Sequence, residues 1–158
     1  MARRYGYARR GAPAVIVAPI HGPHHTIVGA MTGTGLLTSM MLPGAVDGPA
    51  FLVFLEHFLV PTLQPGDIVV MDNVRTHKVA GVKELIEGAG ATIAYQPPYS
   101  PDLNPIELLW AFAKDYVRGM GPRSIENLTN AFGTAFQRVK PEHCRGWFRA
   151  CGYQAQQL

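Results

Sequence analysis

Two acidic side chains stand at positions where a protein can bind a metal ion. Asp72 follows the apolar run Ile68–Met71, and Glu107 follows a proline-rich segment that ends at Asn104-Pro105. The 34 residues at positions 73–106 separate the two. Carboxylates brought together from separate elements are ligands that Mg²⁺ and Mn²⁺ prefer, and such ions promote attack on phosphodiesters. The pair therefore predicts a divalent metal site for phosphodiester chemistry.

The elements around these carboxylates are those of a layered α/β domain. Two apolar runs, 26–31 and 36–42, flank Gly33-Thr34-Gly35 and predict a hairpin. The apolar run Ile68–Met71 predicts a strand buried on both faces beside a parallel neighbour. The other expected elements are a strand over Ala14–Pro19, a helix capped by Asp47, a helix over Lys78–Glu87, a strand over Ala91–Tyr95, and helices that begin at Asn104, Ser124 and Pro141. Hairpin, helix, strand, helix, strand and three helices together predict the α/β class.

The side chains expected to form the core recur at helical spacing. They are Phe51, Phe54, Leu55, Phe58 and Leu59 in the first helix, Val79, Val82 and Ile86 in the second, Leu109, Phe112, Ala113 and Tyr116 in the third, and Ile125, Leu128, Phe132, Ala135 and Val139 in the fourth.

Each carboxylate also has a simpler explanation. Asp72 is expected at the carboxyl end of its strand, the edge where open α/β sheets bind ligands, but an Asp can also cap the following turn. Glu107 comes three residues after the expected cap Asn104, where a glutamate can close a capping box. The helix N-terminus also keeps a carboxylate there ionised, as a metal ligand requires. The sequence leaves these alternatives open.

The net charge of +3 conceals a pattern along the chain. Residues 1–10 and 118–149 are basic, whereas residues 11–117 hold four basic and nine acidic side chains. An acidic centre between basic ends suits a metal-dependent enzyme that acts on a polyanion, although ordinary surface charge gives the same counts. The side chains expected to contact DNA are Arg3, Arg4, Arg9, Arg10, Arg75, His77 and Lys78.

Bulk properties limit the remaining choices. The 158 residues predict one domain, and no apolar stretch reaches the length of a membrane span. The two cysteines, Cys144 and Cys151, are expected about two turns apart on one helix, too far for a disulfide. Reduced cysteines predict a cytoplasmic location.

One segment resembles a known family. The run Pro97–Glu107 (PPYSPDLNPIE), with Asp72-Asn73 and Thr76-His77-Lys78 before it, is similar to the last two blocks of the DDE transposases of bacterial insertion sequences related to mariner elements. The resemblance covers nearly the whole chain. It implies a ribonuclease-H-like mixed sheet flanked by helices, with Asp72 as the second catalytic acid and Glu107 as the third. It also implies two Mg²⁺ or Mn²⁺ ions that serve DNA cleavage and strand transfer during transposition.

The chain departs from that family at its start. In the family, a helix-turn-helix region and a first strand with the first catalytic acid precede a segment like Arg4-Tyr5-Gly6, whereas the first acidic residue here is Asp47. The resemblance therefore implies a truncated catalytic domain without its first strand. The implied partners are the element ends and target DNA in the nucleoid, and an upstream reading-frame product or another transposase subunit. A non-catalytic DNA-binding remnant and an unrelated Mg²⁺ phosphohydrolase are the alternatives. The phosphohydrolase would need an early strand that ends in Asp-x-Asp, and this sequence has none.

Overall fold

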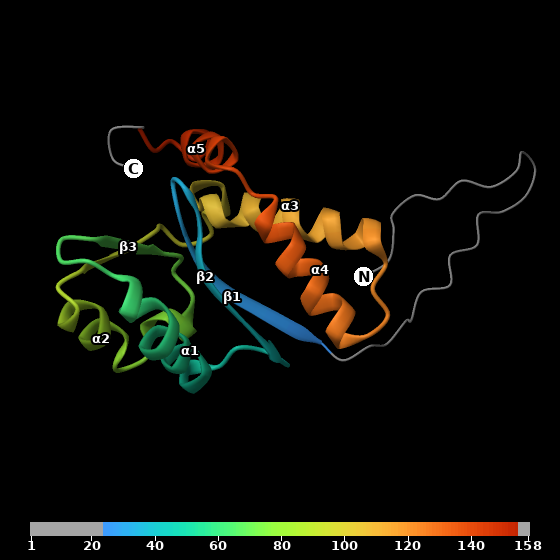
Figure 1. Ribbon diagram of the computed structural model, residues 1–158. Helices are drawn as coiled ribbons and strands as arrows, with labels where there is room; N and C mark the ends of the chain where they lie inside the picture. The colour runs from blue at the N-terminus through green and yellow to red at the C-terminus, as the bar shows by residue number, and fades with distance from the viewer. Residues whose placement is uncertain (1–23, 155–158) are drawn as a thin grey trace, which may run out of the picture.

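A long antiparallel hairpin lies between two groups of helices in the computed structural model, which describes residues 24–154 (Figure 1). Its strands are β1 (His25–Thr32) and β2 (Gly35–Pro43), so the hairpin predicted from the sequence is confirmed. Among residues 24–154, no helix combines the length and the hydropathy that crossing a membrane requires. The strand expected over Ala14–Pro19 lies outside the described residues.

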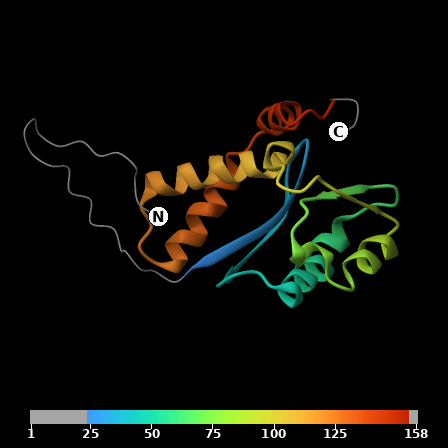
Figure 2. The ribbon, with the colours of Figure 1, turned by 180° about the vertical axis from the view of Figure 1, so that it is seen from behind.

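The hairpin separates two hydrophobic cores. Successive side chains of a strand point to opposite faces. Val28, Ala30 and Met40 pack against the first core, whereas Ile27 and Met41 pack against the second. The view from behind shows the same division, with α3 and α4 on one side of the hairpin and β3, α1 and α2 on the other (Figure 2). Each face of the hairpin therefore packs on one of the two cores.

Helices and strands from the middle of the chain build the first core. They are α1 (Gly48–Phe54), the π-helical turn η1 (Leu55–Leu59), the 3₁₀ turn η2 (Val60–Thr62), β3 (Ile68–Met71), the 3₁₀ turn η3 (Arg75–Lys78), α2 (Val82–Gly88) and β4 (Thr92–Tyr95). Asp47 caps α1 as predicted, because its Oδ1 accepts a hydrogen bond of 2.9 Å from Ala50 N. Phe58 was expected in the core but is 37% exposed, since the wider π-helical turn changes the angular spacing of side chains.

β3 and β4 pair in parallel, as the sequence predicted, and form a two-stranded sheet separate from the hairpin. The expectation that β3 is buried on both faces is wrong. Met71 is buried and Val69 packs on the first core, but Ile68 is 66% exposed and Val70 is 43% exposed. Among the described residues β3 pairs only with β4, so one face and one edge of the strand lack a covering layer.

Three C-terminal helices complete the fold. They are α3 (Pro105–Met120), which follows the 3₁₀ turn η4 (Pro101–Leu103), α4 (Ile125–Gln137) and α5 (Pro141–Ala150). Val117, absent from the predicted set, is fully buried in the second core between α3 and α4. Ile125 was expected in that core but is 49% exposed, because it occupies the first position of α4. Val139 follows the end of α4.

Candidate active site

Asp72 stands where the parallel strands end. It follows Met71, the last residue of β3, and Gln96 follows Tyr95, the last residue of β4. Gln96 N donates a hydrogen bond of 2.8 Å to Met71 O, which continues the ladder one residue past β4. The carboxylate of Asp72 therefore lies at the carboxyl edge of the pair, where α/β sheets bind ligands.

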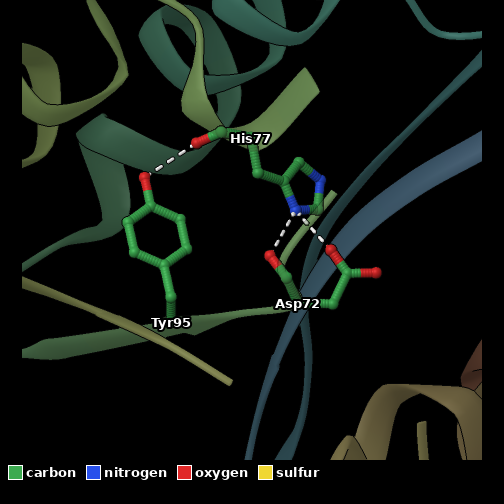
Figure 3. Close-up of polar contacts among 3 residues, drawn as sticks. All are labelled: Asp72, His77 and Tyr95. Atoms are coloured by element: carbon green, nitrogen blue, oxygen red, sulfur yellow. Dashed lines mark hydrogen bonds and ion pairs between the residues drawn. The ribbon is translucent and has the colours of Figure 1, made fainter. Parts of the chain in front are cut away.

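The two carboxylate oxygens of Asp72 have different surroundings (Figure 3). Nδ1 of His77 lies 2.6 Å from Oδ1 and 3.4 Å from the main-chain carbonyl oxygen of Asp72. Oδ1 is inaccessible to solvent, and no well-aligned hydrogen bond reaches it. The Asp72 side chain is nevertheless 40% exposed, so its exposed oxygen is Oδ2. One oxygen thus faces His77 while the other points away from it.

His77 is in turn fixed by residues of other elements. Tyr95 Oη donates a hydrogen bond of 2.8 Å to His77 O, and the imidazole lies 4.3 Å from the ring of the buried Phe51, centroid to centroid. Nζ of Lys78 lies 5.4 Å from the centre of the Tyr95 ring, and Arg75 is exposed. The phosphate contacts expected of Arg75, His77 and Lys78 stay predictions.

Glu107 occupies the first turn of α3 and is exposed. Asn104 stands at the cap position as predicted, but its side chain makes no capping bond. In the described part of the chain the Glu107 side chain has no polar partner, so no capping box occupies it. Pro105 and Leu109, on either side of Glu107, are both buried. The helix holds Glu107 in place while leaving its carboxylate available for a ligand.

A buried polar cluster anchors the segment between the two carboxylates, and the sequence did not indicate it. Gln96, only 6% exposed, donates from Nε2 to Leu103 O at 2.7 Å and to Tyr153 Oη at 3.3 Å. Tyr153 Oη also donates to Leu103 O, at 3.1 Å. The cluster joins the end of β4, the approach to α3 and the segment after α5. Gln96 and Tyr153 are 57 positions apart, so no local pattern reports the contact.

Tyr99 lies in the same connecting segment and has an unusual backbone. Its φ is 58°, and it is the one non-glycine residue with a positive φ in the described part of the chain. Its side chain is fully exposed. Pro98 before it and Pro101 two residues after it restrict the neighbouring backbone.

The cysteines supply no nucleophile to this region. Cys144 and Cys151 are both buried and unpaired, as the sequence predicted. Burial raises the pKa of both thiols, which keeps them protonated and unreactive near neutral pH.

The acidic side chains set a limit on metal binding. Every Asp and Glu of the sequence lies within residues 24–154, yet no group of three His, Cys, Asp or Glu in that part of the chain could hold an ion. Asp72 and Glu107 offer hard oxygen donors, the type that suits Mg²⁺ or Mn²⁺. The arginines Arg3, Arg4, Arg9 and Arg10 lie outside the described residues.

Comparison with known families identifies the chain. The family model of the DDE superfamily endonucleases matches residues 1–129, and the chain belongs to this family. No curated protein sequence matches the chain.

Solved structures confirm the fold. The chain is similar to the Mos1 transposase in its paired-end complex with the left transposon end, with a TM-score of 0.76 and 20% identity over 94% of this chain and 47% of that one. A Mos1 mariner paired-end complex with Mn gives a TM-score of 0.72 at 19% identity, and the match covers 94% of this chain and 46% of that one. The Mos1 catalytic domain with Raltegravir and Mn gives a TM-score of 0.63 at 18% identity, and the match covers 79% of this chain and 67% of that one. The fold is ribonuclease-H-like, and the chain spans about half the length of the Mos1 chains in these two complexes.

Proposed function

We propose that the chain is part of a transposase catalytic domain, in which Asp72 and Glu107 supply two of the acids that bind divalent ions for DNA cleavage and strand transfer. One observation carries the proposal: Asp72 presents a solvent-facing oxygen at the carboxyl edge of a parallel strand pair. The family match and the fold support the same reaction class.

The bound ions would supply charge stabilisation at the phosphodiester and activation of the attacking hydroxyl. Asp72 and Glu107 would hold them, since Mg²⁺ and Mn²⁺ favour carboxylate oxygens. The solved Mos1 catalytic domains with Mn and with Mg support divalent metal use. The bacterial insertion-sequence origin expected from the sequence is part of the same proposal, as is the location in the cytoplasm and nucleoid.

The site needs a further acid from another polypeptide segment. The chain has no Asp or Glu before Asp47, and no group of three His, Cys, Asp or Glu within residues 24–154 could hold an ion. An upstream reading-frame product or a second transposase subunit would supply it. Two carboxylates leave several positions of an ion to water, so the isolated chain should bind Mn²⁺ weakly and should not cut DNA.

Titration of the chain with Mn²⁺, followed by the electron paramagnetic resonance of the free ion, tests the two ligands. We expect Asp72→Ala and Glu107→Ala each to abolish the weak binding. Asp115→Ala is the matched control, because Asp115 lies on α3, is 88% exposed and pairs only with Arg118 at 3.9 Å in the described part of the chain. Binding that survives in Asp72→Ala would contradict the proposal.

Nicking of supercoiled plasmid in Mn²⁺ tests whether the site is incomplete. The chain alone should leave the plasmid intact, and a chain extended at its N-terminus by an acid-bearing strand should nick it. Robust nicking by the chain alone that Asp72→Ala removes would place the third ligand within these 158 residues. A chain that binds DNA but no Mn²⁺ would favour the alternative, a non-catalytic DNA-binding remnant.

DNA binding should depend on salt and not on sequence. If Arg3, Arg4, Arg9 and Arg10 each neutralise one phosphate, raising the salt from about 50 to 200 mM should weaken binding on the order of 100-fold through counterion release. Fluorescence anisotropy with two unrelated duplexes measures this. Replacing the four arginines by glutamine should flatten the salt dependence, and an unchanged slope would show that other side chains carry the contact.

A further inference from the structure

His77 faces two oxygen atoms of one residue through a single nitrogen. Nδ1 lies 2.6 Å from Oδ1 of Asp72 and 3.4 Å from its carbonyl oxygen (Figure 3). Both oxygens are acceptors, so Nδ1 must carry the proton. The N–H points at the main-chain oxygen and meets Oδ1 at a poor angle, which explains why Oδ1 lies close to Nδ1 without a hydrogen bond of its own. The contact thus defines the tautomer of His77.

The imidazole is held in this position from two sides. The Phe51 ring, part of the first core, packs against it at 4.3 Å, and the His77 side chain is only 23% exposed. Tyr95 fixes the main chain of His77 through its hydroxyl, and the same tyrosine pairs with Met71 across the β3–β4 sheet. His77 therefore connects the Asp72 side chain to β4 and to the first core, in addition to the connection that Asp72 has to β3 through the main chain.

We propose that His77 is the positioning residue of Asp72: it holds Oδ1 and leaves Oδ2 as the single oxygen that Asp72 offers to a divalent cation. This inference rests on the proposed function. It assigns Nδ1 to Asp72, so a phosphate contact through that nitrogen is excluded. Outer partners that orient a metal-binding side chain are typically worth one to two orders of magnitude in metal affinity.

The ¹⁵N spectrum of the histidine rings tests the contact without any metal or DNA. In the full chain, His77 should show a protonated Nδ1, and Asp72→Ala should shift its ring ¹⁵N signals, because only the main-chain oxygen of residue 72 then accepts from Nδ1. His57, an exposed histidine of η1, should be unaffected by Asp72→Ala. A wild-type His77 protonated only at Nε2 would overturn the inference, whatever the function of the chain.

Mn²⁺ binding then tests the consequence. His77→Ala should weaken binding about 10- to 100-fold, whereas the control His57→Ala should not change it. An asparagine amide can occupy the place of Nδ1, while the glutamine amide extends to the place of Nε2. His77→Asn should therefore restore most of the affinity and His77→Gln should not.

The outcomes separate this inference from the proposed function. Mn²⁺ binding that Asp72→Ala abolishes but His77→Ala leaves intact would overturn the positioning role and keep the function. Equal losses in His77→Asn and His77→Gln would also overturn it, because a merely space-filling histidine predicts no difference between them. A wild-type chain that binds no Mn²⁺ would contradict the function and this inference together.

Discussion

The Asp72 carboxylate is held directly by a neighbouring side chain, whereas the Glu107 carboxylate is positioned only by the helix that carries it. His77, five residues from Asp72, approaches its Oδ1 at 2.6 Å. Glu107 is exposed, and its position follows from the burial of Leu109 and from the packing of α3 on the hairpin.

The difference teaches where each carboxylate is vulnerable. The partners of Asp72 lie on adjacent elements, so substitutions near it in sequence should disturb it. Glu107 depends on residues far from it in the sequence, including Gly29 of β1 and Tyr153 after α5. Substitutions at Gly29 or Tyr153 should therefore move Glu107 and leave the Asp72–His77 contact intact.

The largest effect is expected from the helix that carries Glu107. Leu109 is fully buried, so Leu109→Ala should leave a cavity and lower the free energy of unfolding by about 2–5 kcal/mol. Urea denaturation measures this loss. The neighbouring Leu108 is 37% exposed, and Leu108→Ala should cost much less. Equal losses in the two variants would show that burial on this face does not hold the helix.

A smaller effect is expected where α3 meets the hairpin. A Cβ atom added at Gly29 would lie 3.0 Å from Thr38 O and 3.0 Å from Cη2 of Trp110. The backbone oxygen cannot yield, so Gly29→Ala should push the Trp110 ring away at a cost of about 1–3 kcal/mol.

Tryptophan fluorescence and thermal unfolding measure the Gly29→Ala change. Gly35→Ala is the matched control, because nothing lies within 4 Å of a Cβ added at Gly35. The ¹⁵N signals of His77 should not change in either variant. A shift of those signals in Gly29→Ala would mean that the two carboxylate regions are coupled.

The smallest effect is expected from the buried cluster before α3. Gln96→Ala removes the 2.7 Å hydrogen bond to Leu103 O but also an unpartnered buried acceptor, Gln96 Oε1, so the net loss of stability should be about 1 kcal/mol or less. Amide hydrogen exchange should nevertheless quicken in the first turn of α3. Gln64→Ala, at an exposed glutamine, should change neither quantity, and unchanged exchange in Gln96→Ala would show that Tyr153 alone fixes Leu103.

Local signals made much of the fold predictable. The sequence predicted the caps at Asp47 and Ser124 and the proline at the start of α3, because each depends on residues within one turn. The parallel pairing of β3 with β4 followed from two apolar runs around a helix. The position of Asp72 at the end of its strand followed from the same pattern.

The errors and omissions have non-local causes. The apolar run of β3 indicated burial, but the exposure of Ile68 and Val70 depends on what covers the sheet, which a strand pattern does not record. The Gln96–Tyr153 contact joins segments that only the tertiary fold brings together. The approach of His77 to Asp72, which the sequence did not indicate, depends on the direction of one 3₁₀ turn. The phosphate contact expected of His77 stays a prediction.

The positive φ of Tyr99 limits which residues are favourable at this position of the loop. A left-handed backbone costs a residue with a Cβ about 1–2 kcal/mol, and the fully exposed ring of Tyr99 has no burial to offset that cost. A library randomised at position 99 and sorted only for folding should therefore enrich glycine and asparagine over tyrosine. Sorting the same library for activity would show whether tyrosine is enriched under that selection. Enrichment would mean that Tyr99 lowers the stability of the loop and contributes to function.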